Sequence, residues 1–399
     1  MSTTPSSPLE VLLAFFKLGI SSFGGPIAHI GYFREEFVVR RCWLDEHAFA
    51  DVVGLCQFLP GPASSQVGFS IGLMRAGFLG ALAAWTGFTL PSAIFLVVFA
   101  YGAGALRGTI GAGLLHGLKL VAVAIIAQAV WGMARTLAPD RERASIAVVA
   151  ALIVLLSPTS FAQIAAIGAG AVAGFFLSRA SEPPRNSHIA LPVTRTIGFC
   201  GIAIFFVVLL GLPILRALTG SQALALFDAF YRSGALVFGG GHVVLPLLRE
   251  AFVTPGWVSD DAFLAGYGAA QAVPGPLFTF AAYLGTVVGP SPHGIAGAVL
   301  GLIAIFLPGM LILVGTLPFW DAFRRRQAAQ AAMRGVNAAV VGLLGAALYN
   351  PVWTAAVKTP ADVAIALVGF ALLAAWRAPP LLVVCVSALG GVAQAFIKA

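Results

Sequence analysis

Long apolar segments with almost no charge are the feature that most constrains this chain. Charged residues make up only 10% of the sequence and hydrophobic residues 59%, whereas soluble domains carry roughly 25% charged residues. The apolar segments are rich in Gly and Ala and interrupted by Pro, as in membrane-spanning helices that pack through small residues. No alternating pattern typical of transmembrane strands recurs. The sequence therefore predicts an all-α, polytopic integral membrane protein.

The charge of the chain predicts orientation in a membrane rather than a nucleic-acid partner. Its 23 Lys and Arg residues give a formal net charge of +8, yet they stand in ones and twos between apolar segments, where basic residues set the orientation of spans. The N-terminus lacks the positive region of a signal peptide, so we expect it to remain and to lie in the cytoplasm. The cysteines have no metal-site or disulfide spacing, and we expect neither a metal nor a cofactor.

A constant shift along the sequence reveals a repeat. Residues 15–38, FFKLGISSFGGPIAHIGYFREEFV, align with residues 230–253, FYRSGALVFGGGHVVLPLLREAFV. A Pro-Gly-Pro follows in each copy, at residues 60–62 and 274–276, and a Gln precedes each one at the same distance. So many ordered matches predict a duplication.

The repeat predicts four segments. These are an N-terminal transmembrane repeat (1–178), a cytoplasmic linker (179–196), an extra transmembrane helix (197–217) and a C-terminal repeat (218–399). In the first repeat we expect helices near residues 8–22, 24–38, 46–73, 78–104, 111–134 and 144–178. One unmatched crossing between the repeats predicts that the second is inverted in the membrane. The arginines also indicate inversion, because they cluster at different loops in the two halves and basic loops mark the cytoplasmic face.

The two Pro-Gly-Pro segments are predicted to break apolar helices. Pro60 and Pro62, and likewise Pro274 and Pro276, remove backbone donors and leave peptide groups that lipid cannot satisfy. In secondary transporters such breaks lie near the midplane, where half-helix N-termini offer N–H groups to an anion. The alternative is a kink or a turn outside the membrane.

Candidate substrate-binding residues lie in or beside the Phe-Gly-Gly and Pro-Gly-Pro segments. Hydroxyl and amide groups donate hydrogen bonds, glycines admit a ligand to the backbone or allow close helix packing, and cations inside apolar helices bind a partner or snorkel to the interface. A structural, hydrogen-bonded role is the alternative for the histidine. The candidates are Lys17, Ser21, Ser22, Gly24, Gly25, Gln57, Gly61, Ser64 and Ser65 in the first half, and Arg232, Gly239, Gly240, His242, Gln271, Gly275 and Thr279 in the second.

Other ionisable residues are candidates for gating or coupling. Arg34-Glu35 and Arg249-Glu250 end the second helix of each half, where they could form structural ion pairs at the membrane surface or act as a gate. Asp51 and Lys119 lie within apolar stretches, and ionisable residues there are functional candidates.

The motifs FGGPIAHIGYFREEFV with QFLPGPASSQVGFSIG, and FGGGHVVLPLLREAFV with QAVPGPLFTFAAYLG, resemble the chromate ion transporter family in its long, two-domain form. The resemblance covers nearly the whole chain. It implies export of chromate from the cytoplasm across the inner (plasma) membrane, driven by the membrane potential or a proton gradient, and hence chromate resistance. Sulfate is the similar oxyanion that would compete. The second half departs from the first by having Gly241 where the first has Pro26.

Several function classes are disfavoured. The chain has no GxxxxGK[ST] phosphate-binding loop and no HExxH or GxSxG motif, so ATP-driven transport and an intramembrane enzyme are not expected. The alternatives that stay open are a sulfate or other oxyanion importer or exchanger and a passive anion channel. Expected partners are chromate or sulfate and the lipid bilayer, with a homodimer left open.

Overall fold

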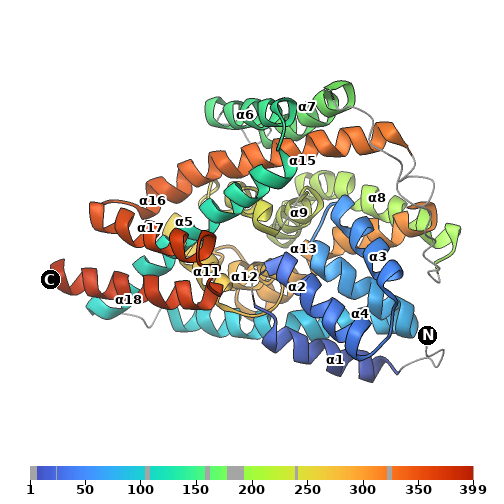
Figure 1. Ribbon diagram of the computed structural model, residues 1–399, viewed down its shortest axis with the longest axis horizontal. Coiled ribbons are helices and arrows are strands. Elements are labelled where there is room, and N and C mark those ends of the chain that lie inside the picture. The colour runs from blue at the N-terminus through green and yellow to red at the C-terminus, as the bar shows by residue number, and fades with distance from the viewer. Residues whose placement is uncertain are drawn as a thin grey trace.

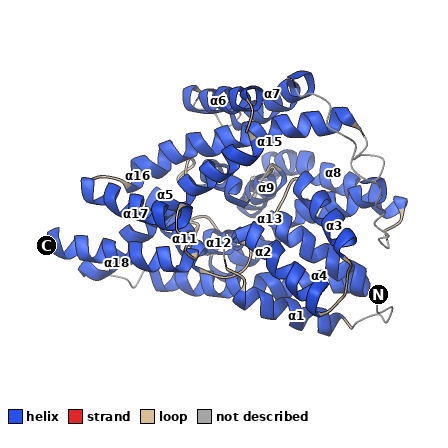
Figure 2. Cartoon of the chain, viewed as in Figure 1, coloured by secondary structure: helices blue, strands red, loops and turns tan. Residues whose placement is uncertain are grey.

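The computed structural model describes residues 7–23, 25–103, 108–157, 162–177, 193–238, 241–320 and 326–398. Within these ranges the chain is built from helices and contains no strand (Figure 2). Six of the described helices are long and apolar enough to cross a bilayer. The predicted all-α, polytopic membrane fold is confirmed.

The first half contains a series of helices near the predicted positions. They are α1 (Pro8–Ser21), α2 (Gly25–Phe33) with its π-helical continuation η1 (Arg34–Arg40), α3 (Glu46–Phe58), α4 (Ala63–Ala103), α5 (Gly108–Leu137), α6 (Arg141–Leu156) and α7 (Ala162–Leu177). The long α4 folds back at Ala76 and Gly77, whose backbone angles are not helical. Its two arms approach so closely that a Cβ on Gly72 would lie 2.3 Å from the carbonyl oxygen of Gly80. The bend between its two arms lies at the predicted boundary between residues 73 and 78.

The second half repeats this order. It contains α9 (Gln222–Ala235), η2 (Gly241–Val243), α10 (Val244–Phe252), α11 (Asp260–Ala272), η3 (Leu277–Thr279), α12 (Phe280–Val287), α13 (Gly294–Thr316), η4 (Leu317–Phe319), α15 (Gln327–Ala347), the π-helical η5 (Leu348–Trp353), α16 (Thr354–Ala356), α17 (Pro360–Ala374) and α18 (Pro380–Lys398). The bend of α4 corresponds here to the turn between α12 and α13. Gly285 and Gly297 meet across that turn as Gly72 and Gly80 do in the first half.

Corresponding helices begin at corresponding caps. The side chains of Ser7 and Asp45 accept backbone N–H bonds at the N-termini of α1 and α3. Ser221 and Ser259 do the same for α9 and α11. Ser and Asp favour this position because their short side chains reach the unpaired N–H groups of the first turn.

The predicted unmatched crossing is α8 (Arg195–Thr219), which packs against α9 and α13. Tyr231 on α9 donates its hydroxyl to the backbone oxygen of Phe205 at 3.1 Å. The other face of α8 is apolar and open, since Phe199, Val207 and Leu210 are exposed, as expected of a helix that faces lipid. The predicted linker falls almost entirely on residues 178–192, which lie outside the described residues.

The halves exchange their final hairpins. The α6–α7 hairpin of the first half packs on α15 of the second, and the α17–α18 hairpin of the second packs on α5 of the first. Figure 1 shows α6 and α7 beside α15, and α17 and α18 near α5. This exchange joins the two halves into a single body.

Glycines permit the close approach of the exchanged helices. A Cβ on Gly335 of α15 would lie 1.9 Å from the Gly170 oxygen of α7, and one on Gly117 of α5 would lie 2.4 Å from the Ser387 oxygen of α18. Small residues at these crossings allow backbone contact, which drives helix association in lipid.

We expect Gly335→Val to loosen the contact between α7 and α15. The added side chain would overlap the backbone of α7, and overpacking costs about 1–3 kcal/mol. Thermal unfolding of the purified protein in detergent should show a lower midpoint. Gly132→Val is the matched control, because a Cβ there meets nothing within 4 Å. Equal midpoints for the two variants would contradict tight packing at this crossing.

Candidate functional site

Both Pro-Gly-Pro segments interrupt helices, as predicted. The first lies between α3 and α4, and the second lies between α11 and η3. Gly61 has a φ of 118° and Gly275 a φ of 99°, a region that residues with a Cβ rarely adopt. Each break therefore requires its central glycine.

Each break is bonded to the opposite half of the chain. The Gly61 N–H donates to the backbone oxygen of Val237 at 2.8 Å, and the Gly275 N–H donates to the backbone oxygen of Ser22 at 2.9 Å. Ser22 and Val237 occupy corresponding positions, directly before Phe23 and Phe238. These reciprocal bonds bring each Pro-Gly-Pro next to the Phe-Gly-Gly segment of the other half.

The walls of the two breaks also correspond. A Cβ on Gly61 would lie 2.9 Å from the Gly309 Cα, and one on Gly275 would lie 2.9 Å from the Ser92 Oγ. Gly309 directly follows Pro308 inside α13, and Ser92 directly follows Pro91 inside α4. A proline-containing helix therefore closes the break of the opposite half in each case.

The first turn of α4 concentrates buried polar groups at the first break. Ser64, Ser65 and Gln66 are 3%, 2% and 0% exposed. The Gln66 Nε2 donates to the backbone oxygens of Pro60 at 2.9 Å and Gly309 at 2.8 Å. The Ser64 Oγ lies 3.3 Å from the His29 Nδ1. These contacts fix the turn that begins the half-helix.

Several polar atoms near this turn lack protein partners. Among the described residues, the buried Oγ atoms of Ser22 and Ser65 and the Oε1 of Gln66 make no hydrogen bond. An unpaired buried polar group costs about 1–3 kcal/mol, so these atoms are suited to a ligand. The first N–H groups of α4 are also available to a ligand, because a helix provides no internal acceptor for them.

The second break is built differently. The Thr279 Oγ1 donates to the backbone oxygen of Pro276 at 2.7 Å, so this hydroxyl already has an acceptor. The His242 Nδ1 lies 2.7 Å from the Tyr267 hydroxyl oxygen. The Nε2 of Gln271 is buried and has no partner among the described residues. The two half-sites are therefore unequal in their chemistry.

The structure does not bring the two predicted cations to the breaks. Lys17 is exposed on α1, and Ser21, also exposed, donates to its backbone oxygen. Arg232 instead donates to Asp228 at 2.6 Å and to the backbone oxygen of Leu209 on α8 at 2.9 Å. Asp228 is buried and also accepts from Arg216.

The remaining substrate-binding candidates fall into two groups. Gln57 is exposed near the C-terminal end of α3, and Gly25 begins α2 with a φ of 80°. Gly24, Gly239 and Gly240 lie outside the described residues.

The candidate gating arginines form ion pairs, but with other acids than their sequence neighbours. Arg34 pairs with Glu46, and Arg249 donates to Asp260 at 3.0 and 3.3 Å. Glu46 and Asp260 correspond in the repeat and each begins the next helix. Their shared position was the signal that could have identified them.

The neighbouring acids and the two isolated candidates have separate places. Glu35 is exposed, and Glu250 accepts from the Thr254 hydroxyl at 3.1 Å. Lys119 on α5 pairs with Asp261 on α11 at 2.5 Å. Asp51 lies partly buried on α3. The pairing of Lys119 joins the first half to the second.

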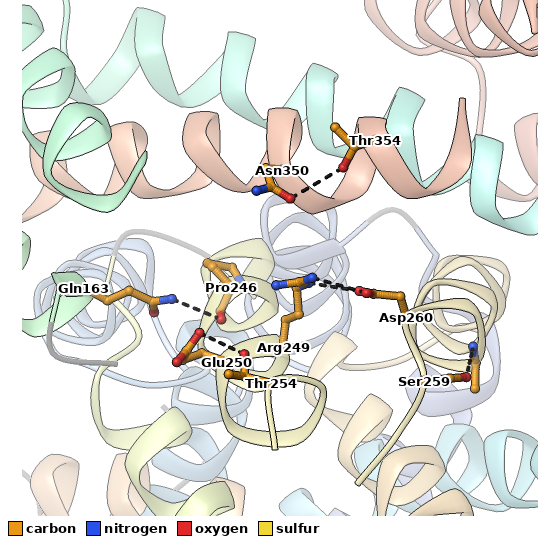
Figure 3. Close-up of polar contacts among 10 residues, drawn as sticks. Gln163, Pro246, Arg249, Glu250, Thr254, Ser259, Asp260, Asn350 and Thr354 are labelled. Carbon is orange, nitrogen blue, oxygen red and sulfur yellow. Dashed lines mark hydrogen bonds and ion pairs between the residues drawn. The ribbon is translucent and has the colours of Figure 1, made fainter. Parts of the chain in front are cut away.

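Arg249 and Glu250 line a cavity of about 260 Å³ between the α6–α7 hairpin, α10 and α15. Figure 3 shows Arg249 directed toward Asp260, with Gln163 bonded to the backbone oxygen of Pro246 at 3.3 Å. The polar lining residues missed from the sequence are Ser157, Gln163, Thr254 and Asn350. Among the described residues no cluster of three or more His, Cys, Asp or Glu side chains could hold a metal ion.

Comparison with known proteins identifies relatives of the whole chain. The chromate transport protein of Pseudomonas aeruginosa is 30% identical over 97% of this chain and 92% of its own length. The probable chromate transport protein of Synechococcus elongatus is 29% identical over 97% and 96%. The chromate transport protein of Cupriavidus metallidurans is 27% identical over 98% and 94%. No solved structure matches the chain significantly.

The family model described as chromate transporter matches the chain in two parts, residues 9–175 and 224–392. Each part contains one Phe-Gly-Gly and one Pro-Gly-Pro segment. The unmatched interval contains α8 and the predicted linker. This multi-pass membrane protein therefore belongs to the chromate transporter family.

Proposed function

We propose that the chain is a secondary transporter that exports chromate from the cytoplasm across the plasma membrane and so confers chromate resistance. The observation that carries this proposal is the reciprocal bonding of the broken helices, Gly61 to Val237 and Gly275 to Ser22. It supports one shared site between the halves, at which half-helix N-termini from both repeats meet. The membrane potential or a proton gradient would drive export.

The first break supplies the hydrogen-bond donors for the oxyanion. The buried Ser22 and Ser65 hydroxyls have no acceptor among the described residues, and the N–H groups of the first turn of α4 add a partial positive charge. The Nε2 of Gln271 adds a further unpaired donor from the second half. Hydrogen bonds to a charged partner are stronger than those between neutral groups, so uncharged donors suffice for a dianion.

We place the anion at the breaks rather than at Lys17 and Arg232. Arg232 is bonded to buried Asp228 and to α8, so its guanidinium is held by these partners. Lys17 is exposed on the outer surface of α1, consistent with snorkelling. Both cations therefore have structural roles and do not surround the anion.

Alternating access would come from rocking of the two halves about the shared site. Inverted repeats allow this, because the same contacts can open to either side of the membrane. The corresponding bonds at the two breaks and the exchanged hairpins are consistent with a twofold relation. Sulfate has the same charge and a similar tetrahedral shape, so uncharged donors would admit it as a competitor.

Flux in inside-out membrane vesicles tests the function. We expect labelled chromate to accumulate, more so with an imposed membrane potential that is positive inside the vesicles, and excess sulfate to compete. Ser65→Ala should raise the KM for chromate about tenfold or more, because a hydrogen bond to a charged group contributes about 1.5–3 kcal/mol. The chromate flux at saturation measures whether the chain remains folded.

Ser145→Ala is the control for this experiment. Ser145 is exposed on α6 and its hydroxyl donates to the backbone oxygen of Arg141 at 2.8 Å, far in sequence from either break. Its KM should equal that of the unmodified protein. An unchanged KM in Ser65→Ala would remove that hydroxyl from the site, and vesicles without chromate flux would refute the function itself.

Cysteine labelling tests the inverted topology. Residues 107 and 325, which lie in corresponding loops, fall outside the described residues, so we choose exposed Cys42 after η1 and exposed Pro255 after α10. In a chain with Cys42 as its one cysteine, and in a cysteine-free chain carrying Pro255→Cys, an impermeant thiol reagent should label opposite faces of the membrane. Labelling from the same face would rule out inversion.

A further inference from the structure

A polar seam runs between η2–α10 and α11, consisting of Arg249, Asp260, His242, Tyr267 and Gln271. Its outer end is the Arg249–Asp260 ion pair, beside the 260 Å³ cavity. Figure 3 shows this end, where Arg249 and Asp260 face one another from the two elements. The seam therefore begins at a space wide enough for several water molecules.

The seam continues inward by helical spacing. His242, Pro246 and Arg249 recur at intervals that place them on one face of η2–α10, and Asp260, Tyr267 and Gln271 recur likewise along α11. The two faces meet a second time where the His242 Nδ1 lies 2.7 Å from the Tyr267 hydroxyl. Pro246, one turn outward from His242, lines the cavity.

The inner end of the seam is the second break. Gln271 follows Tyr267 by one turn of α11, and its buried Nε2 has no partner among the described residues. Three residues further lies Pro274, followed by Gly275, whose N–H bonds Ser22 of the first half. The polar groups thus extend from the cavity to the proposed oxyanion site.

The first half has no such seam. Its outer ion pair, Arg34–Glu46, corresponds to Arg249–Asp260. The positions that correspond to His242 and Tyr267 are Ile27 and Val53, and neither side chain can bind a proton. The His–Tyr pair therefore lies in one half only.

From this geometry we propose that His242, held by Tyr267, binds a proton that leaves the cytoplasm together with the oxyanion, so that each cycle moves a net negative charge outward. This inference rests on the proposed function, specifies its coupling ion and selects the membrane potential as the driving force. The proton comes from water in the cavity and adds to the neutral imidazole, giving an imidazolium with N–H groups on both nitrogens. No covalent bond to the oxyanion forms.

The coupling is electrostatic. The positive charge of protonated His242 favours a dianion at the second break, and the dianion in turn favours the protonated ring. Each therefore binds more tightly when the other is present. Tyr267 fixes the ring, because its hydroxyl oxygen can accept from the Nδ1–H in either charge state. His242 as a residue is only partly buried, and Pro246, one turn along the same face, lines the cavity from which the proton comes.

The charged groups on the elements around η2 and α10 already have partners. The titratable and charged groups are Arg249 and Glu250 on α10 itself, Asp228, Tyr231 and Arg232 on α9, Arg334 on α15 and, across the hydrogen bonds of the seam, Asp260, Asp261 and Tyr267 on α11. Arg249 pairs with Asp260, and Arg232 and Arg216 share Asp228. The described η3 segment, Leu277–Thr279, has no ionisable side chain.

Proteoliposomes that contain a pH-sensitive dye measure chromate and proton movement together. The unmodified protein should move both. In His242→Gln the proton movement should be lost while chromate still crosses, and chromate flux should no longer respond to an imposed pH gradient. His293→Gln is the control, because His293 is exposed before α13, and it should keep the original proton-to-chromate ratio.

Tyr267→Phe gives a second, nearly isosteric test. It should reduce proton movement relative to chromate, since the ring loses the hydroxyl that fixes it. Should both variants stop all transport, retained chromate binding would agree with obligatory coupling, whereas lost binding would place the pair in the anion site and overturn the proposal. An unchanged ratio in either variant, or chromate movement without protons in the unmodified protein, would also overturn it. Absent chromate flux in the unmodified protein would instead refute the proposed function.

Discussion

Lipid cannot hydrogen-bond a peptide group, and this constraint governs how the two halves of the chain meet. Each half contains a broken helix whose central glycine has an N–H that bonds to the other half. The other half supplies an acceptor, through Gly61 to Val237 and Gly275 to Ser22. The close walls at Gly309 and Ser92 exclude lipid from the breaks. The final hairpins, which pack on the opposite half, add to this connection between the halves.

Local patterns in the sequence predicted the helices and their interruptions well. The proline pairs identified the breaks, and the bend of α4 fell at the predicted boundary, because both depend on residues next to one another in the chain. The acceptors Val237 and Ser22 could not be predicted, since any backbone oxygen could serve and only the assembled fold chooses one. Arg232 shows a different gap: its partner Asp228 lies one turn earlier on the same helix, so helical spacing alone could have identified it.

The two half-sites have diverged within a common backbone. The first contains buried hydroxyl and amide groups on the opening turn of α4, whereas the second contains the His242–Tyr267 pair and a threonine whose hydroxyl is already bonded. Gly241 in place of Pro26 accompanies this difference. On our proposals the first half chiefly holds the oxyanion and the second chiefly holds the proton. A duplicated scaffold would then divide the two tasks of a coupled transporter between its copies.

The central claim is that one oxyanion binds between the broken helices of opposite halves. An experimental structure of the protein with chromate bound tests it most directly, because chromium scatters strongly enough to locate the ion. We expect the ion within hydrogen-bond distance of the Ser65 hydroxyl and the first N–H groups of α4, facing Gln271. An ion bound at Lys17 or Arg232, with the two breaks left empty, would contradict the claim.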